Sequence, residues 1–213
     1  MTKGKIVLIL FSGLLVAPSV FAKEGFTVSF GFGGALNYDE SVKLELDGQD
    51  DIDLGNLSFN TKPFKTPLYW DVKLGYWQQH KGWELELLHH KLYASGIDNP
   101  RVSHLEVTHG YNLVYLNRVI EFRPSWYGRF GLGAVVPHPD ITLDGKQLGG
   151  GYHLAGPSAQ LGLEKTYRFN DDFLVGIEGK MTYSYAKVDF DGGSFDLPNT
   201  AVHLLVSLQY DPE

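Results

Sequence analysis

The sequence of 213 residues contains no cysteine. Disulfide bonds, a thiol nucleophile and cysteine-ligated metal sites are therefore excluded. Segments with helical periodicity are nearly missing, and no apolar run after residue 22 reaches the length of a membrane-spanning helix. An excess of basic residues is also missing, because the formal net charge is −7. This charge argues against nucleic acid as a partner.

The first 22 residues have the pattern of an export signal. Lys3 and Lys5 precede the apolar run IVLILFSGLLVAPSV, and Val20 and Ala22 occupy the small-residue positions before a cleavage point. The pattern predicts a signal peptide at residues 1–22 that is cleaved after Ala22, leaving one domain at residues 23–213. The alternative is a retained anchor helix, but Pro18 lies where a spanning helix would continue.

Glycine and aromatic residues are abundant, with 25 Gly, 12 Tyr, 13 Phe and 4 Trp. Eight segments alternate apolar and polar residues in the manner of strands. They are residues 25–36, 66–79, 82–93, 103–118, 124–137, 151–167, 172–188 and 199–210. Short connections alternate with longer ones at 37–65, 94–102, 138–150 and 189–198. The sequence therefore predicts an all-β fold, an eight-stranded antiparallel up-and-down transmembrane β-barrel, with short periplasmic turns and long outer loops.

The stretch GWELELLHHKLY at residues 82–93 raises the question of which face points outward. Trp83, Leu85 and Leu87 alternate with Glu84 and Glu86. A soluble, lipocalin-like barrel would carry long charged residues on its outer face. The polar faces here are instead rich in Gly, Ser and Thr with a few charges of mixed sign, which favours a narrow lumen inside and an apolar face toward lipid. The same rule predicts that Tyr111, Leu113 and Tyr115 face lipid.

The inward positions define a predicted lumen network. Its members are Asp71, Lys73, Glu84, Glu86, Glu106, Arg129, Glu164, Glu178 and Lys180, with His203 from the last strand. Buried charges persist mainly when they are paired, so the network predicts a polar plug. The alternatives are a narrow cation-lined path or a site where one carboxylate stays protonated.

Four histidines are candidates for chemistry. His90, His104 and Glu106 share inward parity, and a register with His90 opposite Glu106 would bring the three together. Such a group can be structural, metal-binding, proton-sensing or a general base. His89 and His109 point toward lipid, either at the level of the headgroups or because a bulge between Leu87 and His90 shifts the alternation. A lipid-modifying enzyme would need one of them paired with a serine or an acid.

The chain resembles small outer-membrane barrels of the OmpA/OmpX kind, including lipid A-modifying members of similar strand number. The resemblance covers the whole mature chain and lies in its pattern. The stretches ELELLHHKLY, HGYNLVYLNR and GGGYHLAGP also look like a group of uncharacterised proteobacterial barrel proteins. In one respect the chain departs from such barrels, which usually end on an aromatic residue that the assembly machinery reads. Tyr210 lies three residues before the end of this sequence.

The resemblance implies the outer membrane of a Gram-negative bacterium, with membrane lipid, lipopolysaccharide and the barrel assembly machinery as partners and no cofactor. A structural or interaction role for a plugged barrel with external loops is the expected function. The alternatives are a lipid A deacylase or acyltransferase, and a narrow channel or carrier for a small ligand. The sequence leaves the oligomeric state open.

Overall fold

The computed structural model describes residues 23–212, and the predicted signal peptide lies outside this range. The described part of the chain is all-β, with twelve strands in one antiparallel sheet. The strands are β1 (Gly25–Asn37), β2 (Glu40–Leu46), β3 (Ile52–Asn60), β4 (Trp70–Gln78), β5 (Lys81–Ser95), β6 (Val102–Arg123), β7 (Trp126–Pro137), β8 (Asp140–Leu143), β9 (Lys146–Gly149), β10 (Gly156–Arg168), β11 (Phe173–Phe190) and β12 (Gly193–Tyr210). Among residues 23–212, no helix has the length and apolarity needed to cross a bilayer.

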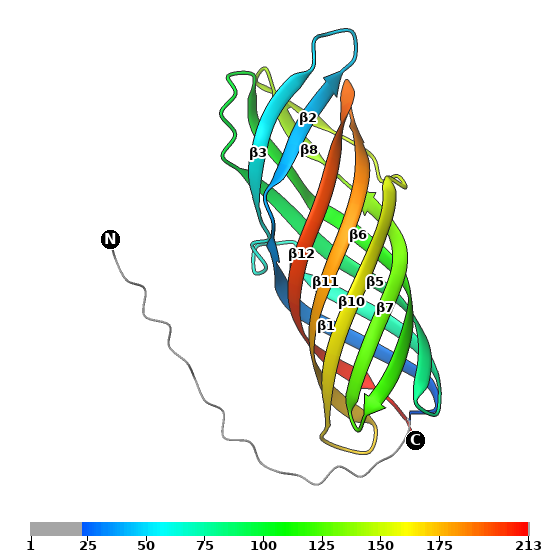
Figure 1. Ribbon diagram of the computed structural model, residues 1–213. Coiled ribbons are helices and arrows are strands. Elements are labelled where there is room, and N and C mark those ends of the chain that lie inside the picture. The colour runs from blue at the N-terminus through cyan, green and yellow to red at the C-terminus, as the bar shows by residue number, and fades with distance from the viewer. Residues whose placement is uncertain (1–22, 213) are drawn as a thin grey trace.

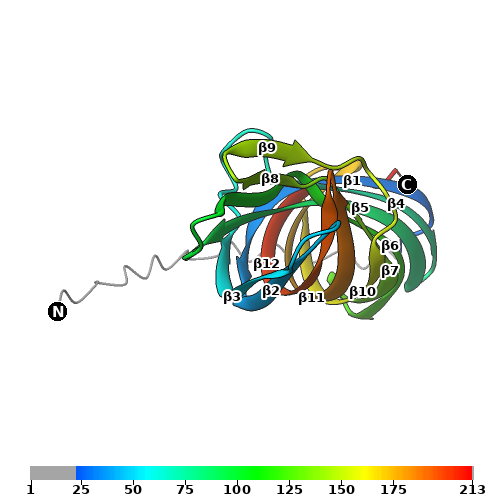
Figure 2. The ribbon, with the colours of Figure 1, turned by 90° about the horizontal axis from the view of Figure 1, so that it is seen from above.

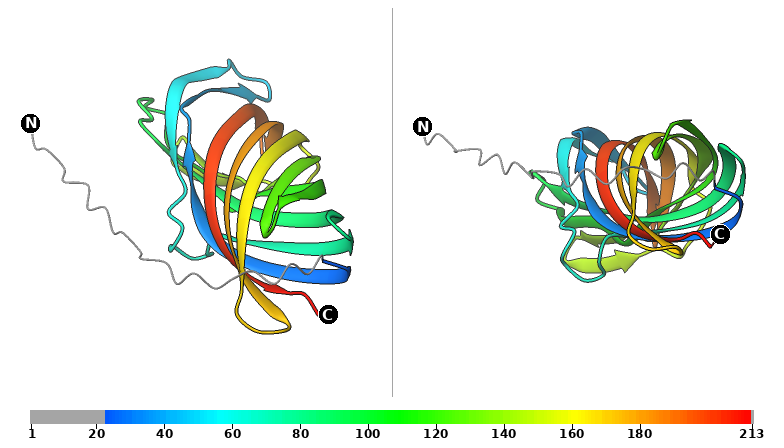
Figure 3. Two further views of the ribbon diagram at one scale, coloured as in Figure 1. Left: turned by 60° about the horizontal axis from the view of Figure 1, so that its bottom comes forward. Right: turned by 90° about the horizontal axis from the view of Figure 1, so that it is seen from below.

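The long strands are arranged around a common axis (Figure 2). Strand β1 pairs with β12 along one edge and with β4 along the other. From β4, successive antiparallel pairings lead through β5, β6, β7, β10 and β11 to β12. Each of these strands therefore has a partner on both sides along part of its length. Short turns join β4 to β5, β6 to β7 and β10 to β11 at the lower end, where the chain also ends (Figures 1 and 3).

Two of the predicted loops contain strands, which is why the structure has twelve strands where the sequence predicted eight. The segment 37–65 forms the β2–β3 hairpin, which pairs with β12 and β5 and extends the sheet at the upper end (Figure 1). The segment 138–150 forms the small β8–β9 hairpin on the side of β6. The physical reason is that Val42, Leu44 and Leu46 alternate with charged residues and become fully or nearly buried.

A third predicted loop, at 189–198, is also mostly strand. Strands β11 and β12 continue in register to the pair Phe190↔Gly193, so only Asp191 and Gly192 form the turn. Gly192 has a positive φ of 99°, a conformation that suits glycine at such a tight turn. Phe195 and Leu197 lie on the buried face of this extension, and their burial explains why the strands continue.

The predicted orientation of the two faces is confirmed for most strands. Phe30, Leu85, Leu161 and Leu204 are 43–64% exposed on the outer face, whereas Glu86 on the inner face is 0% exposed. Exposed apolar residues of this kind form a band around the long strands.

Strand β6 contradicts the predicted orientation. Tyr111, Leu113 and Tyr115 were expected to face lipid, but they are fully buried inside, and Leu116 and Ile120 are the exposed residues. The expectation was wrong because it treated the interior as uniformly polar. The upper part of the interior is apolar, so apolar side chains can point either way at that level.

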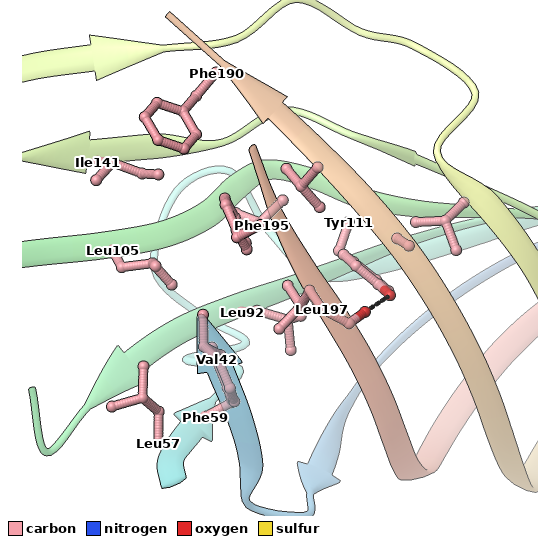
Figure 4. Packing of buried hydrophobic residues seen from close by; sticks show 14 of the residues in the cluster. Val42, Leu57, Phe59, Leu92, Leu105, Tyr111, Ile141, Phe190, Phe195 and Leu197 are labelled. Atoms are coloured by element: carbon pink, nitrogen blue, oxygen red, sulfur yellow. Dashed lines mark hydrogen bonds between the residues drawn. The ribbon is translucent and has the colours of Figure 1, made fainter. Parts of the chain in front are cut away.

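A hydrophobic core fills the upper part of the molecule (Figure 4). Val42 and Leu57 come from the β2–β3 hairpin, and Leu105 comes from β6, Ile141 from β8 and Phe195 from β12. The core therefore joins hairpins that are far apart in the sequence. At the edge of this core, the buried hydroxyl of Tyr111 has a hydrogen-bond partner, because it donates to the carbonyl of Leu197 at 3.0 Å.

Candidate functional site

A network of buried charges occupies the lower part of the interior, with Arg129 of β7 at its centre. The guanidinium Nε donates to Glu84 Oε2 at 2.7 Å, and Nη2 donates to Glu164 Oε2 at 3.2 Å. Nη1 pairs with Glu178. One cation thus connects strands β5, β10 and β11 through three carboxylates. The planar fork of arginine suits this multiple contact better than a lysine would.

Two lysines continue the network upward. Lys73 Nζ lies 2.5 Å from Asp71 Oδ2 and 2.8 Å from Glu178 Oε2. Lys180 pairs with Glu86, whose Oε2 also accepts from Asn117 at 2.8 Å and from Gln160 at 2.7 Å. The predicted lumen charges are therefore brought together, with the exception of Glu106, and each carboxylate has a cationic partner.

Small residues opposite the charged side chains make room for them. A Cβ at Gly31 would overlap the carboxylate of Asp71, and one at Gly131 would overlap the amides of Asn117 and Gln160. At these two positions the interior has room for a hydrogen atom but not for a methyl group, which explains why the polar faces contain glycine there.

The lower end of the interior is closed by Lys23. Its ammonium donates to Gln209 Oε1 at 3.0 Å and lies 4.9 Å and 4.8 Å from the ring centroids of Trp77 and Tyr127. The amide of Gln209 in turn donates to Glu164 at 2.5 Å. Sequence reasoning missed Lys23, because it lies before the first predicted strand.

A layer of tyrosine and histidine separates the charged network from the apolar core. The hydroxyl of Tyr69 contacts Nδ1 of His203, whose Nε2 lies 2.8 Å from Thr182 Oγ1. Nε2 of His90 lies 3.1 Å from Asn199 Oδ1, and the two histidine rings are 5.2 Å apart. His90 and His203 are thus interior residues, as their parity predicted. Their hydrogen bonds to Asn199, Tyr69 and Thr182 hold the layer together.

The predicted cluster of His90, His104 and Glu106 does not form. A bulge at residues 108–110 of β6, opposite Lys91, shifts the register, so His90 pairs with Tyr111 and Glu106 pairs with Tyr93. Glu106 lies on the face of β6 opposite the buried Leu105, and it contacts Thr108 at 2.8 Å and His104 at 3.2 Å. Glu106 is therefore no member of the interior network. Neither His104 nor Glu106 faces the interior charges.

No metal site replaces that cluster in the part of the chain that the structure describes. Groups of three or more His, Asp or Glu side chains placed to hold a metal ion are missing from residues 23–212.

His89 and His109 are brought together on the outer wall, at one groove of about 470 Å³. Its lining residues are Pro67, Trp70, Leu87, His89, His109, Asn112, Val114, Val136 and Tyr152. They come from β4, β5, β6, β7 and the β3–β4 and β9–β10 connections, so the groove exists only in the folded sheet. The pairing of β5 with β6 is regular from Leu87 to His90, so the alternative of a bulge in this stretch is wrong and His89 keeps its outward direction.

The ring of His89 is held by a stacking contact and by a hydrogen bond. It stacks on Trp70 with the ring planes 13° apart and the centroids at 5.3 Å, and it is only 6% exposed. Nδ1 lies 2.8 Å from Asn112 Oδ1. The amide nitrogen of Asn112 donates to the carbonyl of Val136 at 3.2 Å, which leaves Oδ1 as the acceptor. Nδ1 of His89 therefore carries the hydrogen, and Nε2 of the neutral ring is an acceptor.

Nε2 of His89 is buried and has no hydrogen-bond partner among the described residues. Nδ1 of His138, beside the groove, is in the same condition. His138 lies 5.2 Å from the ring of His109 and 4.7 Å from that of Tyr152. His138 and Tyr152 belong to the stretches PHP (137–139) and GGGYH (149–153). Proline and glycine restrict or free the backbone there, and this pattern is the sequence signal for the part of the groove that follows β7.

Exposed ion pairs tie the upper hairpins together. Lys187 lies 2.8 Å from Glu45 and links β11 to β2, and Arg101 lies 2.7 Å from Asp144 and links the β5–β6 connection to the β8–β9 turn. The hydrogen bond from Lys187 lowers the pKa of the Glu45 carboxyl, and that from Arg101 lowers the pKa of Asp144. Both pairs are open to solvent and contribute little to stability.

Comparison with solved structures identifies similar molecules. The outer membrane protein OprG from Pseudomonas aeruginosa has a TM-score of 0.50 and 13% identity, over 89% of this chain and 96% of that one. Neisserial surface protein A has a TM-score of 0.44 and 12% identity, over 90% of this chain and 99% of that one. The outer membrane protease OmpT from Escherichia coli has a TM-score of 0.42 and 8% identity, over 94% of this chain and 99% of that one.

At this level of identity the likeness to OprG shows the fold alone, which is that of an outer-membrane β-barrel protein. No protein-family model matches the chain. A comparison with curated proteins also finds no match. The finer resemblance to the OmpA/OmpX kind stays a prediction.

Proposed function

We propose that this chain is a plugged, non-conducting barrel in the outer membrane of a Gram-negative bacterium, with a structural or interaction role. Residues 1–22 are removed on export, and strands β1, β4–β7 and β10–β12 close into an eight-stranded transmembrane barrel. The location implies outer-membrane lipid, lipopolysaccharide and the barrel assembly machinery as partners. The outer wall and the upper hairpins, rather than the lumen, make the contacts.

The apolar outer band supports the membrane location. Phe26, Leu132 and Leu163 are 48–76% exposed, and similar residues surround the long strands. Soluble monomers rarely expose apolar patches of this extent. The band needs an apolar environment, and acyl chains supply one.

The observation that carries the plug is that the interior is filled at three successive levels. The Arg129 network lies lowest, the Tyr69–His203–His90 layer follows, and the apolar core around Phe195 lies above. An ion crossing this interior would have to break buried ion pairs and then pass a layer of packed apolar side chains. Eight strands leave room for side chains but little for water, which points the same way.

Conductance in planar bilayers tests this proposal. Purified full-length mature protein, reconstituted alongside a porin as the positive control, is expected to give no stable channel steps, because side chains fill the interior at all three levels. Stable, large steps from the protein alone would contradict the plug. Fractionation of cell membranes tests the location separately.

A lipid-modifying activity is the second candidate, favoured by the unpartnered Nε2 of His89. The described residues that line the groove include no serine and no carboxylate, so His89 itself would have to take a proton from the attacking water. Mass spectrometry of lipid A from cells with and without the protein tests this candidate. Unchanged acylation would remove it.

A further inference from the structure

The groove around His89 combines an apolar wall with one unsatisfied acceptor. Leu87, Val114 and Val136 form the apolar part of the lining, and Leu87 is directly opposite Val114 in the β5–β6 register. Immediately below, Leu85 is paired with Leu116, and these two residues are 53% and 56% exposed. The groove is therefore continuous with the outer apolar band, and a chain that lies against the band can enter it.

At the polar end of the groove, Nε2 of His89 lacks a hydrogen-bond donor among the described residues. Nε2 of His89 accepts, because the hydrogen on Nδ1 is directed to Asn112. A buried acceptor without a partner is rare in folded proteins and is costly to maintain. A hydroxyl group satisfies this acceptor, whereas a choline headgroup has no hydrogen to donate.

The position of the groove selects the source of that hydroxyl. Tyr152 and Pro67 belong to the β9–β10 and β3–β4 connections, which join strands at the end opposite the short turns. In the orientation of the proposed function this end is external, so the groove opens on the outer leaflet. The lining carries no formal negative charge among the residues described, so it does not repel a phosphorylated sugar headgroup.

We propose that this groove binds a glycolipid of the outer leaflet, with an acyl chain against Leu87, Val114 and Val136 and a sugar hydroxyl donating to Nε2 of His89. The site deepens the proposed function and rests on its orientation in the membrane. Trp70 stacks on His89 and holds the ring, and Asn112 fixes its tautomer, so the acceptor is pre-organised.

The test is a titration monitored on the imidazole nitrogens. Full-length mature protein with 15N-labelled histidine, in dodecylphosphocholine micelles, is titrated with purified lipid A, phosphatidylcholine or phosphatidylglycerol. We expect a saturable shift of the His89 Nε2 resonance with lipid A and none with phosphatidylcholine. No saturable shift with lipid A, or an equal shift with either phospholipid, would overturn the assignment.

Variants separate a hydrogen bond from general lipid contact. His89→Leu removes the acceptor and is expected to weaken lipid A binding by about fivefold or more, the scale of one hydrogen bond. His89→Gln retains an acceptor oxygen and is expected to bind more tightly than His89→Leu. His104→Leu is the matched control, since His104 is a histidine at the same end that does not line the groove. Binding by His89→Leu equal to that of the native protein would contradict the proposal.

Two readouts keep folding and location apart from binding. If His89→Leu fails to fold, as shown by loss of its heat-modifiable gel shift, Asn112→Leu takes its place. Asn112→Leu keeps the imidazole of His89 but removes the partner that fixes its orientation and tautomer, so it too is expected to bind more weakly. Unchanged binding would count against the site. The micelle titration does not depend on where the protein resides, so failure of the outer-membrane location would appear only in fractionation.

Discussion

At the scale of single residues, Arg129 is the side chain on which the interior network depends most. It pairs with Glu84, Glu164 and Glu178 and is 3% exposed. Arg129→Met keeps much of the volume but leaves these carboxylates without their shared cation. We expect the free energy of unfolding to fall by about 3–5 kcal/mol, because removing one partner of a buried ion pair leaves uncompensated charge. Urea unfolding in detergent, followed by tryptophan fluorescence, measures the change.

Arg118→Met is the matched control for that prediction. Arg118 lies on the neighbouring strand β6 but faces outward, 5.1 Å from the ring of Trp83. Its loss leaves no buried carboxylate unpaired, so we expect a change of less than about 1 kcal/mol. Equal destabilisation by the two variants would show that the Arg129 network adds nothing specific.

The interior charges could be placed from the sequence because a strand has a period of two. Once Trp83 and Leu85 are taken as outward, Glu84 and Glu86 must be inward, and no further information is needed. The same rule misplaced Glu106 and His104, because β6 turns Leu105 and the other apolar residues at that level inward. Their partners on β5 are also displaced by the bulge at residues 108–110 of β6. The pairing of His89 with Asn112 and Trp70 also depends on register, which a single sequence does not fix.

At the scale of elements, the β2–β3 hairpin is stabilised by the upper core rather than by the membrane. Leu57 is 0% exposed in that core. Leu57→Ala is expected to destabilise the hairpin by about 2–5 kcal/mol through loss of apolar contact and the cavity left behind. Hydrogen exchange should then become faster in β2 and β3, while amides in the lower halves of β10 and β11 stay protected.

Leu154→Ala provides the comparison for the hairpin prediction. Leu154 lies in the β9–β10 connection and is 75% exposed, so its truncation opens no cavity. Exchange in β2 and β3 should match that of the native protein. Faster exchange throughout the molecule in the Leu57→Ala variant would mean that the upper core and the lower network unfold as one unit.

The hairpin was missed in the sequence for a physical reason. Val42, Leu44 and Leu46 alternate with Lys43 and Glu45 as strand residues should, but the flanking acidic and glycine residues have the composition of a loop. The alternation is short, and what makes it a strand is burial against Phe195 and Leu105, which are distant in the sequence. Tertiary contacts of this kind override local composition.

At the scale of the whole molecule, the interior changes character along the axis. It is charged near the short turns, polar and aromatic at the level of His90 and His203, and apolar under the upper hairpins. This gradient explains why one rule for inward and outward faces succeeded on β1, β4 and β12 but failed on Tyr111 of β6. A polar face marks the interior only where the interior is polar.

The same axis has an inside and an outside end, and the lack of cysteine makes its direction measurable. Asp50, in the β2–β3 turn, and Asp171, in the β10–β11 turn, are exposed at opposite ends. In intact cells, a maleimide that cannot cross the outer membrane should label the Asp50→Cys variant. It should label Asp171→Cys only after the membrane is opened, because short turns face the periplasm in such barrels. The native chain is the blank in both cases, and heat-modifiable migration confirms that each variant is folded. Labelling of Asp171→Cys in intact cells, with Asp50→Cys protected, would reverse the molecule in the membrane and place the His89 groove in the opposite leaflet.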